Sequence, residues 1–336
     1  MQKISAANYP LATVACFDAT CGSLPRRQLD VENNNRFLEN LAAAGAESLL
    51  IGASTGQGHL RTVEELDTWF RSTNEARLGN AIKIALLRPE DGEAANRGLV
   101  ETLVESDFQV AFVRPGNNLP PDATDSDVAA NMLPVVKSIS DANMAVGVYS
   151  IPDVSGIPLR PAAVVELLDQ LGDRLVAIKV TEANYENSTR RFLECERLES
   201  LKIVQGWDPF LADALRDSPA RCGVTSGPMS FAIHQYRHIL DSAAVEDWNE
   251  VTLAQAAVTD LFVSMQDDPG KFADLQRAKM IMGLGHPISA EITSDAVEKV
   301  FSALKAVRRD ADRRRLAKSL NLMDAGPFAE RLQQWI

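Results

Sequence analysis

Two sequence patterns alternate along about the first 225 residues of this chain. Short runs of β-branched and aliphatic residues recur, and each is followed by a longer stretch with the periodicity of an amphipathic helix. The runs predict eight strands, at residues 11–16, 47–52, 81–87, 108–114, 144–149, 175–180, 201–205 and 221–225. Successive strands start roughly 20 to 36 residues apart, which is the size of a βα unit.

Eight consecutive βα units predict an α/β fold whose strands close into a parallel barrel, the TIM (β/α)₈ barrel, rather than an open sheet. Helices between the strands are expected at residues 31–44, 62–78, 93–105, 125–140, 161–171, 185–198 and 208–218. An open sheet that binds a dinucleotide would carry G-x-G-x-x-G after its first strand. Here that strand leads into FDATCG at residues 17–22, which lacks this pattern.

The strand pattern stops after about Gly227, and helical stretches follow at residues 231–243, 247–266, 272–282 and 295–319. We expect the first of these to be the eighth helix of the barrel. The predicted organisation is therefore a barrel over residues 1–243 and a helical extension over residues 244–336. Apolar faces, with Leu253, Ala257 and Leu261, predict that the extension packs on the barrel or at a subunit interface.

Charge and cysteine content exclude several classes of protein. A net charge of −12 repels nucleic-acid phosphates and anionic lipids, so neither is expected as a partner. No apolar run reaches the length of about 18 residues that a membrane span needs, and the first residues do not resemble a secretory signal. Four scattered cysteines are too few for a disulfide framework, which predicts a cytoplasmic protein with reduced thiols. One basic run, at residues 308–315, is interleaved with aspartates and is expected to be a solvated or intersubunit helix face.

One lysine stands where barrel chemistry takes place. Of the ten lysines, only Lys83, Lys179 and Lys202 fall within predicted strands, and only Lys179 stands near the carboxyl end of its strand, where barrel active sites gather. Side chains alternate along a strand, so Lys179 shares a face with Ala177 and is expected to reach into the mouth of the barrel. Burial lowers the pKa of an ammonium, and a neutral amine forms an imine with a ketone. The same pattern also fits a lysine that is ion-paired at a strand end.

Two further segments support a site at this mouth. Tyr149 ends the fifth predicted strand, where its phenol would relay protons beside an imine. The loop after the second strand, residues 52–58 (GASTGQG), combines glycines with the hydroxyl and N–H donors of Ser54 and Thr55. Glycines let a backbone approach an anion closely, and such donors suit a carboxylate.

In this order, the segments resemble the dihydrodipicolinate synthase / N-acetylneuraminate lyase family of class I aldolases. Residues 52–65 (GASTGQGHLRTVEE) are similar to that family's G-[TS]-T-G-E loop with its trailing T-x-E-E, and residues 149–152 (YSIP) with Gly156 to its Y-N-x-P…G motif. Residues 176–179 (VAIK) are similar to its Schiff-base strand, and residues 205–208 (QGWD) and 223–226 (GVTS) to its G-x-D and G-x-x-S segments. The likeness covers about residues 10–240, and the helical tail suits the family's C-terminal helices.

The resemblance implies a role for each matched residue. Lys179 would form the imine, and Tyr149 would relay the proton. Ser54 and Thr55 would hold the carboxylate of a 2-oxo acid, with Ser54 also linked to Tyr149. The remaining substrate-binding positions would be Gly206, Asp208, Thr225 and Ser226, of which Asp208 and Ser226 align with positions that bind substrate hydroxyls. Asp208 also fits the cap of the seventh predicted helix.

The family implies pyruvate or a sugar-derived 2-oxo acid as substrate, no cofactor and no metal, and a homo-oligomer, either a dimer or a tetramer. The chain departs from the family pattern in four ways. The loop glutamate is Gln57, and Tyr149 is followed by Ser150 rather than asparagine. The arginine that binds a second carboxylate in dihydrodipicolinate synthases is Val154, and the second tyrosine, lent across a subunit interface, falls near Asn117. These departures argue against dihydrodipicolinate synthase activity and leave the proton relay either rewired or lost.

The sequence thus predicts a Schiff-base lyase or aldolase that joins or separates pyruvate and an aldehyde, on a 2-keto-3-deoxy sugar acid or a related 2-oxo acid. A dehydratase that uses the same imine and a non-catalytic barrel that binds a 2-oxo acid are the alternatives. A metal enzyme is disfavoured, because the pair His234 and His238 lacks the glutamate of H-E-x-x-H and lies on the outer eighth helix.

Overall fold

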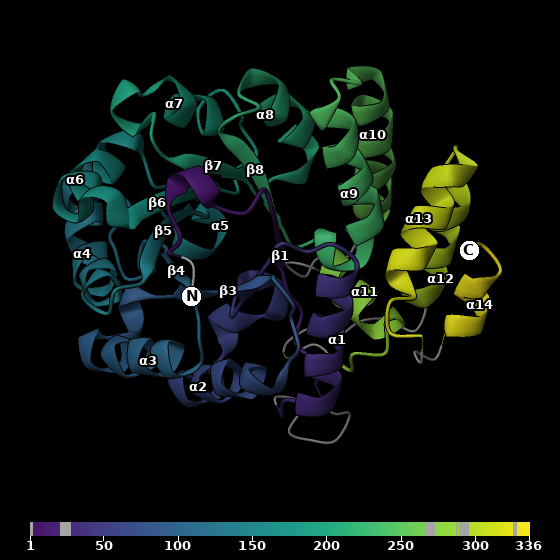
Figure 1. Cartoon of the computed structure of the whole chain (residues 1–336), viewed down its shortest axis with the longest axis horizontal. Helices are drawn as coiled ribbons and strands as arrows, with labels where there is room; N and C mark the ends of the chain where they lie inside the picture. Colours follow the sequence, from purple (N-terminus) through teal and green to yellow (C-terminus); the bar gives the residue numbers. More distant parts are fainter. Residues whose placement is uncertain (1–2, 21–27, 266–272, 287, 289–295, 325–327) are drawn as a thin grey trace.

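A computed structural model describes the chain at residues 3–20, 28–265, 273–286, 288, 296–324 and 328–336. Its centre is a closed barrel of eight parallel strands in sequence order, β1 to β8 (Figure 1). The strands are Ala12–Ala15, Ser48–Ile51, Ile82–Leu87, Val110–Val113, Ala145–Ser150, Leu175–Val180, Lys202–Gln205 and Cys222–Ser226. Each overlaps one of the eight predicted runs, so the predicted TIM barrel is confirmed.

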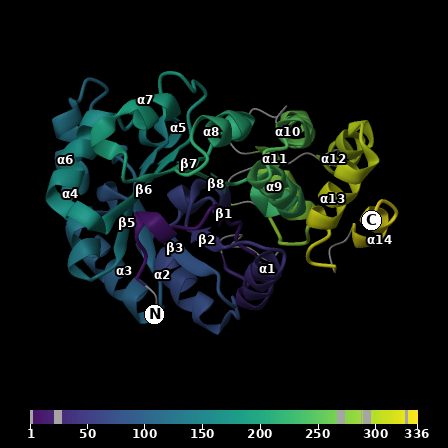
Figure 2. The ribbon, with the colours of Figure 1, turned by 45° about the horizontal axis from the view of Figure 1, so that its top comes forward.

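Helices surround this barrel (Figure 2). Those of the βα units are α1 (Val31–Ala43), α2 (Val63–Ser72), α3 (Glu93–Glu105), α4 (Asp125–Asp141), α6 (Pro161–Leu171), α7 (Thr189–Glu194), α8 (Leu211–Asp217) and α9 (Met229–Ala244). Side-chain caps start three of them, because Asp30, Thr62 and Thr124 each accept a backbone N–H in the first turn. The predicted sixth and seventh stretches, 185–198 and 208–218, are shorter than expected, because 3₁₀ turns at Glu196–Leu198 and Asp208–Phe210 replace part of each. A short helix after β5, α5 (Pro152–Ser155), was not predicted.

The C-terminal helices are α10 (Trp248–Ser264), α11 (Ala273–Ile281), α12 (Ala296–Ala306), α13 (Asp310–Leu320) and α14 (Ala329–Gln333). Helices α10 and α13 both pack on α9, and α12 to α14 lie to one side of the barrel (Figures 1 and 2). The predicted helix ends at residues 266, 272 and 295 lie outside the described residues, as does Cys21.

The prediction of one continuous helix at residues 295–319 is wrong. Arg309, between α12 and α13, has extended backbone angles (φ −88°, ψ 129°). Its guanidinium bonds the buried Asp312 and also Glu250 of α10, at 2.6 Å, and Arg315 bonds Asp312 as well. Part of the basic run therefore attaches α13 to the neighbouring helices, whereas a purely solvated or intersubunit face was expected.

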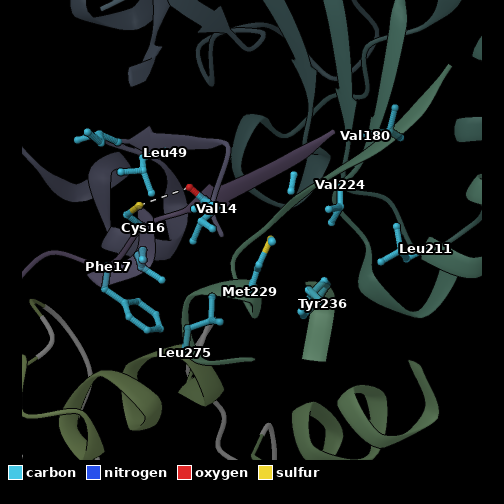
Figure 3. Close-up of a cluster of buried hydrophobic side chains, with 14 of the residues drawn as sticks. Val14, Cys16, Phe17, Leu49, Val180, Leu211, Val224, Met229, Tyr236 and Leu275 are labelled. Atoms are coloured by element: carbon cyan, nitrogen blue, oxygen red, sulfur yellow. Dashed lines mark hydrogen bonds between the residues drawn. The ribbon is translucent and has the colours of Figure 1, made fainter. Parts of the chain in front are cut away.

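Alternation of side chains divides the core into two layers. Inside the barrel, small and apolar residues including Leu50, Phe112, Ala177 and Val204 form one cluster. Tyr9, which precedes β1, packs edge-on against Phe112, with 6.2 Å between the centres of the two rings. The outer layer packs against the helices, and Figure 3 shows Val14 and Val224 of the strands with Met229 and Tyr236 of α9.

Helix α11 also joins this outer layer. Its Leu275 belongs to the same cluster as Phe17, which lies two residues beyond the end of β1 (Figure 3). The thiols of Cys16, Cys195 and Cys222 are free. Within the described ranges, no helix has the length and apolarity needed to cross a membrane.

Candidate active site

Lys179 is the second-to-last residue of β6, near the mouth of the barrel, and its side chain is buried, with 3% exposed. Ala177, two residues earlier, belongs to the inner cluster, so the Lys179 side chain leaves the strand on the inner face. Burial lowers the pKa of Lys179 to about 7, against an opposing effect of the negative charge on Asp208. Lys179 makes no ion pair with any carboxylate of the described residues, so the alternative of an ion-paired lysine is not supported. Much of the amine is therefore uncharged near neutral pH, which is the form that attacks a ketone.

Tyr149 of β5 stands directly opposite Lys179 in the strand register. The Lys179 Nζ atom lies 4.2 Å from the centre of the Tyr149 ring. Burial raises the pKa of the Tyr149 phenol, so the phenol is protonated at neutral pH. Its hydroxyl donates to Thr181 Oγ1 at 3.1 Å, whereas the sequence resemblance implied a link to Ser54. The Tyr149 hydroxyl is thus bonded to Thr181, the residue that follows β6.

Gly206 leaves the space in which this pair is held. A Cβ atom at position 206 would lie 2.1 Å from Thr181 Oγ1 and 3.0 Å from Lys179 Cε. The backbone N–H of Gly206 donates to the Val180 carbonyl oxygen at 2.7 Å. The geometry therefore gives Gly206 the role of making room for Lys179 and Thr181, while its own N–H is engaged within the barrel.

Asp208 follows β7 and is buried with two hydroxyl groups. The hydroxyls of Ser226 and Tyr236 both donate to its Oδ1 atom, and Ser226 Oγ accepts the Met229 N–H at 3.2 Å. Trp207, not Asp208, occupies the cap position of the following 3₁₀ turn, so the capping alternative for Asp208 is wrong. Burial raises the pKa of the Asp208 carboxyl, and the two hydroxyls and Lys179 partly offset that effect. Because the Asp208 charge acts on Lys179 and on Tyr149, these groups form a single electrostatic unit.

Ser54 and Thr55 are buried in a 3₁₀ turn, Ser54–Gly56, which follows β2. Gly58 allows the loop to fold back on its strand, because a Cβ there would lie 1.8 Å from the Gly52 carbonyl oxygen. The Ser54 hydroxyl has no hydrogen-bond partner in the described part of the chain. A buried hydroxyl without a partner is a donor that a substrate carboxylate would satisfy.

The same loop is bonded by residues of the C-terminal extension. Gln276 of α11 donates from Nε2 to the Thr55 carbonyl oxygen at 3.1 Å, and the Ile288 N–H donates to the Gln57 side chain. Gln57, the departure from the family's glutamate, has left-handed backbone angles (φ 55°) and serves here as an acceptor for this contact. The extension therefore contributes to the geometry of the predicted carboxylate site.

A buried charge cluster reinforces this attachment. Asp18, which follows β1, forms ion pairs with Arg61 and with Lys279 of α11, the latter at 2.8 Å, and all three side chains are almost completely buried. Sequence reasoning missed Lys279, because nothing local indicates that a lysine on a C-terminal helix faces the end of β1.

Thr225 is separated from Ser226 by the alternation of side chains along β8. It is fully buried, and its hydroxyl lies next to the Tyr9 phenol together with Thr13. Thr225 therefore faces the inside of the barrel beside Tyr9, and Ser226 faces the outer layer, where it bonds Tyr236 of α9. The structure brings Lys179 and Tyr149 together inside the barrel, and Asp208, whose charge acts on both, is the residue that bonds Ser226.

Two arginines at strand ends were not predicted. Arg88 follows β3, where it bonds Asp91 and the carbonyl oxygens of Gly58 and Arg61. Arg114 follows β4, where it pairs with Glu90 and donates to the Pro115 carbonyl oxygen at 2.8 Å. The sequence pattern that points into the barrel was present at both, because alternation places Arg88 on the inner face with Leu86 and Arg114 on the inner face with Phe112. The reasoning that selected Lys179 applies equally to these residues.

One of the paired histidines, His238, contacts a carboxylate of the C-terminal extension. His238 Nε2 lies 2.6 Å from Glu250 Oε1 on α10, and no group of three potential metal ligands occurs in the described residues.

No family model matches the chain. The sequence is 25% identical over 265 residues to 4-hydroxy-tetrahydrodipicolinate synthase from Xanthomonas axonopodis pv. citri (strain 306), which covers 78% of this chain and 82% of that protein. The structure is similar to YagE from E. coli K12, a prophage protein of the dihydrodipicolinic acid synthase family in complex with pyruvate (TM-score 0.76, 14% identity, 89% of this chain and 99% of that chain). It is also similar to N-acetylneuraminate lyase from Proteus mirabilis (TM-score 0.75, 17% identity, 90% of this chain and 99% of that chain).

Proposed function

We propose that this chain, whose sequence relative and fold confirm its resemblance to the dihydrodipicolinate synthase / N-acetylneuraminate lyase family, is a carbon–carbon lyase that joins or separates pyruvate and an aldehyde through an imine on Lys179. The observation that carries the proposal is the Lys179 amine, buried opposite Tyr149 with a pKa lowered to about 7. The names of the similar proteins, which include a synthase, a lyase and a pyruvate complex, support this class of reaction.

The reaction follows from the properties of these two groups. Lys179 Nζ attacks the 2-oxo carbon, and the Tyr149 phenol gives its proton to the hydroxyl of the adduct, which leaves as water. A protonated imine that withdraws electrons from C3 remains, and Tyr149 is then a phenolate. Tyr149 takes the proton of the C4 hydroxyl while the C3–C4 bond breaks, and the bond electrons remain on C3 as an enamine. The aldehyde leaves, and Tyr149 returns the proton to C3. Water then adds to the protonated imine and gives a proton back to Tyr149, and pyruvate and the free amine are released.

The surrounding residues orient the substrate. Ser54, whose hydroxyl has no hydrogen-bond partner among the described residues, and Thr55 are proposed to hold the carboxylate of the 2-oxo acid. Asp208, whose charge acts on Lys179, is proposed to bind substrate hydroxyls together with Ser226, which donates to it. Val154 packs on the apolar inner cluster, where it supplies no charge for a second carboxylate. These features support a 2-keto-3-deoxy sugar acid rather than an amino-acid partner as the substrate. A homo-oligomer and a cytoplasmic location stay predictions.

Borohydride reduction tests the proposal. We expect incubation with pyruvate and borohydride to add the mass of one reduced pyruvate, and peptide mapping to locate it on Lys179. The Lys179→Arg variant should lose the adduct, whereas Lys83→Arg, a change to another strand lysine, should keep it. Absence of an adduct, or an adduct on another lysine, would contradict the proposal.

A screen of 2-keto-3-deoxy sugar acids then identifies the reaction. Release of pyruvate and an aldehyde supports the lyase, and loss of water without cleavage of C3–C4 identifies the dehydratase. Adduct formation without turnover of any sugar acid identifies a barrel that only binds 2-oxo acids.

A further inference from the structure

Tyr149 must give up and regain a proton in an environment that opposes its ionisation. Burial raises the pKa of its phenol, and its hydrogen-bond partner, the Thr181 hydroxyl, is neutral. A phenolate in such a place forms readily only when a positive charge lies close to its oxygen. The positive charge therefore has to come from a residue close to Tyr149.

The strand register brings Arg114 to the side of Tyr149. Val113 of β4 pairs with Val148 of β5, so the next residues, Arg114 and Tyr149, are neighbours on strands about 4.8 Å apart. Both leave the inner face, because Phe112 and Gly147, two residues earlier, meet inside the barrel, where a Cβ on Gly147 would lie 2.4 Å from the Phe112 ring. Arg114 is 1% exposed, and its Nε atom has no hydrogen-bond partner among the described residues.

The charged groups that face Tyr149 come from four elements. Asp208, after β7, and Asp153, on α5, oppose formation of the phenolate, whereas Arg114, after β4, favours it. Lys179 of β6 changes its charge as the imine forms and breaks. An arginine keeps its charge throughout. Glu90, from the turn after β3, is the ion-pair partner of Arg114 and reduces its effect on the phenol.

We propose that Arg114 is a positioning residue of the proposed lyase, whose guanidinium favours removal of the Tyr149 proton, and that Glu90 moderates this effect. The inference rests on the proposed function, because it concerns the proton that Tyr149 transfers beside the imine. Arg114 would thus supply a fixed positive charge beside Tyr149, from the end of β4.

Exchange of the pyruvate methyl protons with D₂O, followed by NMR, tests the proposal without knowledge of the aldehyde. This exchange needs both the imine and proton transfer at C3. We expect Arg114→Met to slow the exchange about tenfold or more, a part of the roughly 10²- to 10⁴-fold that general acid–base catalysis supplies. Glu90→Gln should speed it, because Arg114 then acts on Tyr149 without a counter-charge. Arg331→Met, which breaks the exposed ion pair with Glu298, should change nothing.

The opposite signs separate this role from a structural one. Arg114→Met and Glu90→Gln break the same ion pair, so a merely structural role predicts that both slow the exchange. Borohydride trapping of pyruvate on Lys179 should proceed at the wild-type rate in both variants, and Arg114→Lys should recover part of the exchange. Equal slowing in both variants, or no change in either, would overturn the inference.

If Arg114→Met does not fold, Glu90→Gln decides alone, since it keeps the arginine. Faster exchange in Glu90→Gln supports the inference, and unchanged or slower exchange overturns it. Failure of the wild-type protein to trap pyruvate would instead overturn the proposed function, and this inference with it.

Discussion

Replacing Gly206 with alanine is expected to disturb both the stability of the barrel and the geometry of its amine. The new Cβ would lie 2.1 Å from Thr181 Oγ1, 3.0 Å from Lys179 Cε and 3.1 Å from the Val180 carbonyl oxygen. The first distance is far below van der Waals contact, and Thr181 has little freedom to retreat, because its N–H donates to the Ser150 carbonyl oxygen at 2.9 Å. Overpacking of a well-packed interior costs about 1–3 kcal/mol. We therefore expect the free energy of unfolding to fall by about that amount.

Two measurements follow the two effects. Urea unfolding reports the loss of stability, and the rate of borohydride trapping with pyruvate reports the position of Lys179. Trapping should slow by roughly an order of magnitude or more, because a displacement of about 1 Å in a reacting group has effects of that size or larger. Gly98→Ala is the matched control, since nothing lies within 4 Å of a Cβ on Gly98 in α3. That change should stabilise the protein by about 0.5–1 kcal/mol and leave trapping unchanged.

A second substitution tests the cause. Thr181→Ala removes the hydroxyl that the new Cβ meets first, so the double variant Gly206→Ala/Thr181→Ala should recover part of the lost stability. It should not recover proton transfer, because Tyr149 then has no hydroxyl to which it donates. The reasoning is refuted if Gly206→Ala unfolds and traps pyruvate like the wild type, or if removal of the Thr181 hydroxyl returns no stability.

Two further predictions concern the buried amine and the carboxylate loop. Lys179→Met should be more stable than the wild type at pH 6 by a few kcal/mol, since a shifted pKa costs about 1.4 kcal/mol per unit. That advantage should shrink as the pH rises from about 7 towards 10.5, because in this window the unfolded lysine keeps a proton that the native lysine has lost. Urea unfolding across this range measures it, and a constant difference would contradict the lowered pKa. Gln276→Leu removes the hydrogen bond to the Thr55 carbonyl oxygen, worth about 0.5–1.5 kcal/mol, so it should raise the pyruvate concentration for half-maximal trapping by about two- to tenfold. The maximal trapping rate should stay the same. Gln170→Leu, on the exposed face of α6, is the control. A lower maximal rate with an unchanged half-saturating concentration would contradict a role for Gln276 in holding the loop.

Local sequence patterns were sufficient to predict the barrel and its central pair. Strand alternation and the position near a strand end identify Lys179 and Tyr149, because both properties depend only on neighbours along the chain. The same pattern was available for Arg88 and Arg114. They were overlooked because an arginine is not itself a nucleophile, although its charge can act on one.

Other features depend on contacts between distant elements, which a single sequence does not encode locally. Tyr236 bonds Asp208 from α9, and Lys279 reaches Asp18 from α11, across 28 and 261 residues of chain. The Tyr149–Thr181 hydrogen bond depends on the space that Gly206 leaves just after β7. The break between α12 and α13 follows from the attachment of Arg309 to Glu250 and Asp312, which competes with the helical periodicity of that stretch.

The pH dependence of pyruvate trapping on Lys179 tests most directly whether this amine is uncharged near neutrality. At pH 7 a lysine with a pKa of about 7 is about half uncharged, whereas an ordinary lysine is uncharged in only about one molecule in three thousand. We predict that the trapping rate, measured by the mass of the Lys179 peptide, rises with a midpoint near pH 7 and is level above about pH 8. A rate that keeps rising towards pH 10, as for a solvent-exposed amine, would contradict the account.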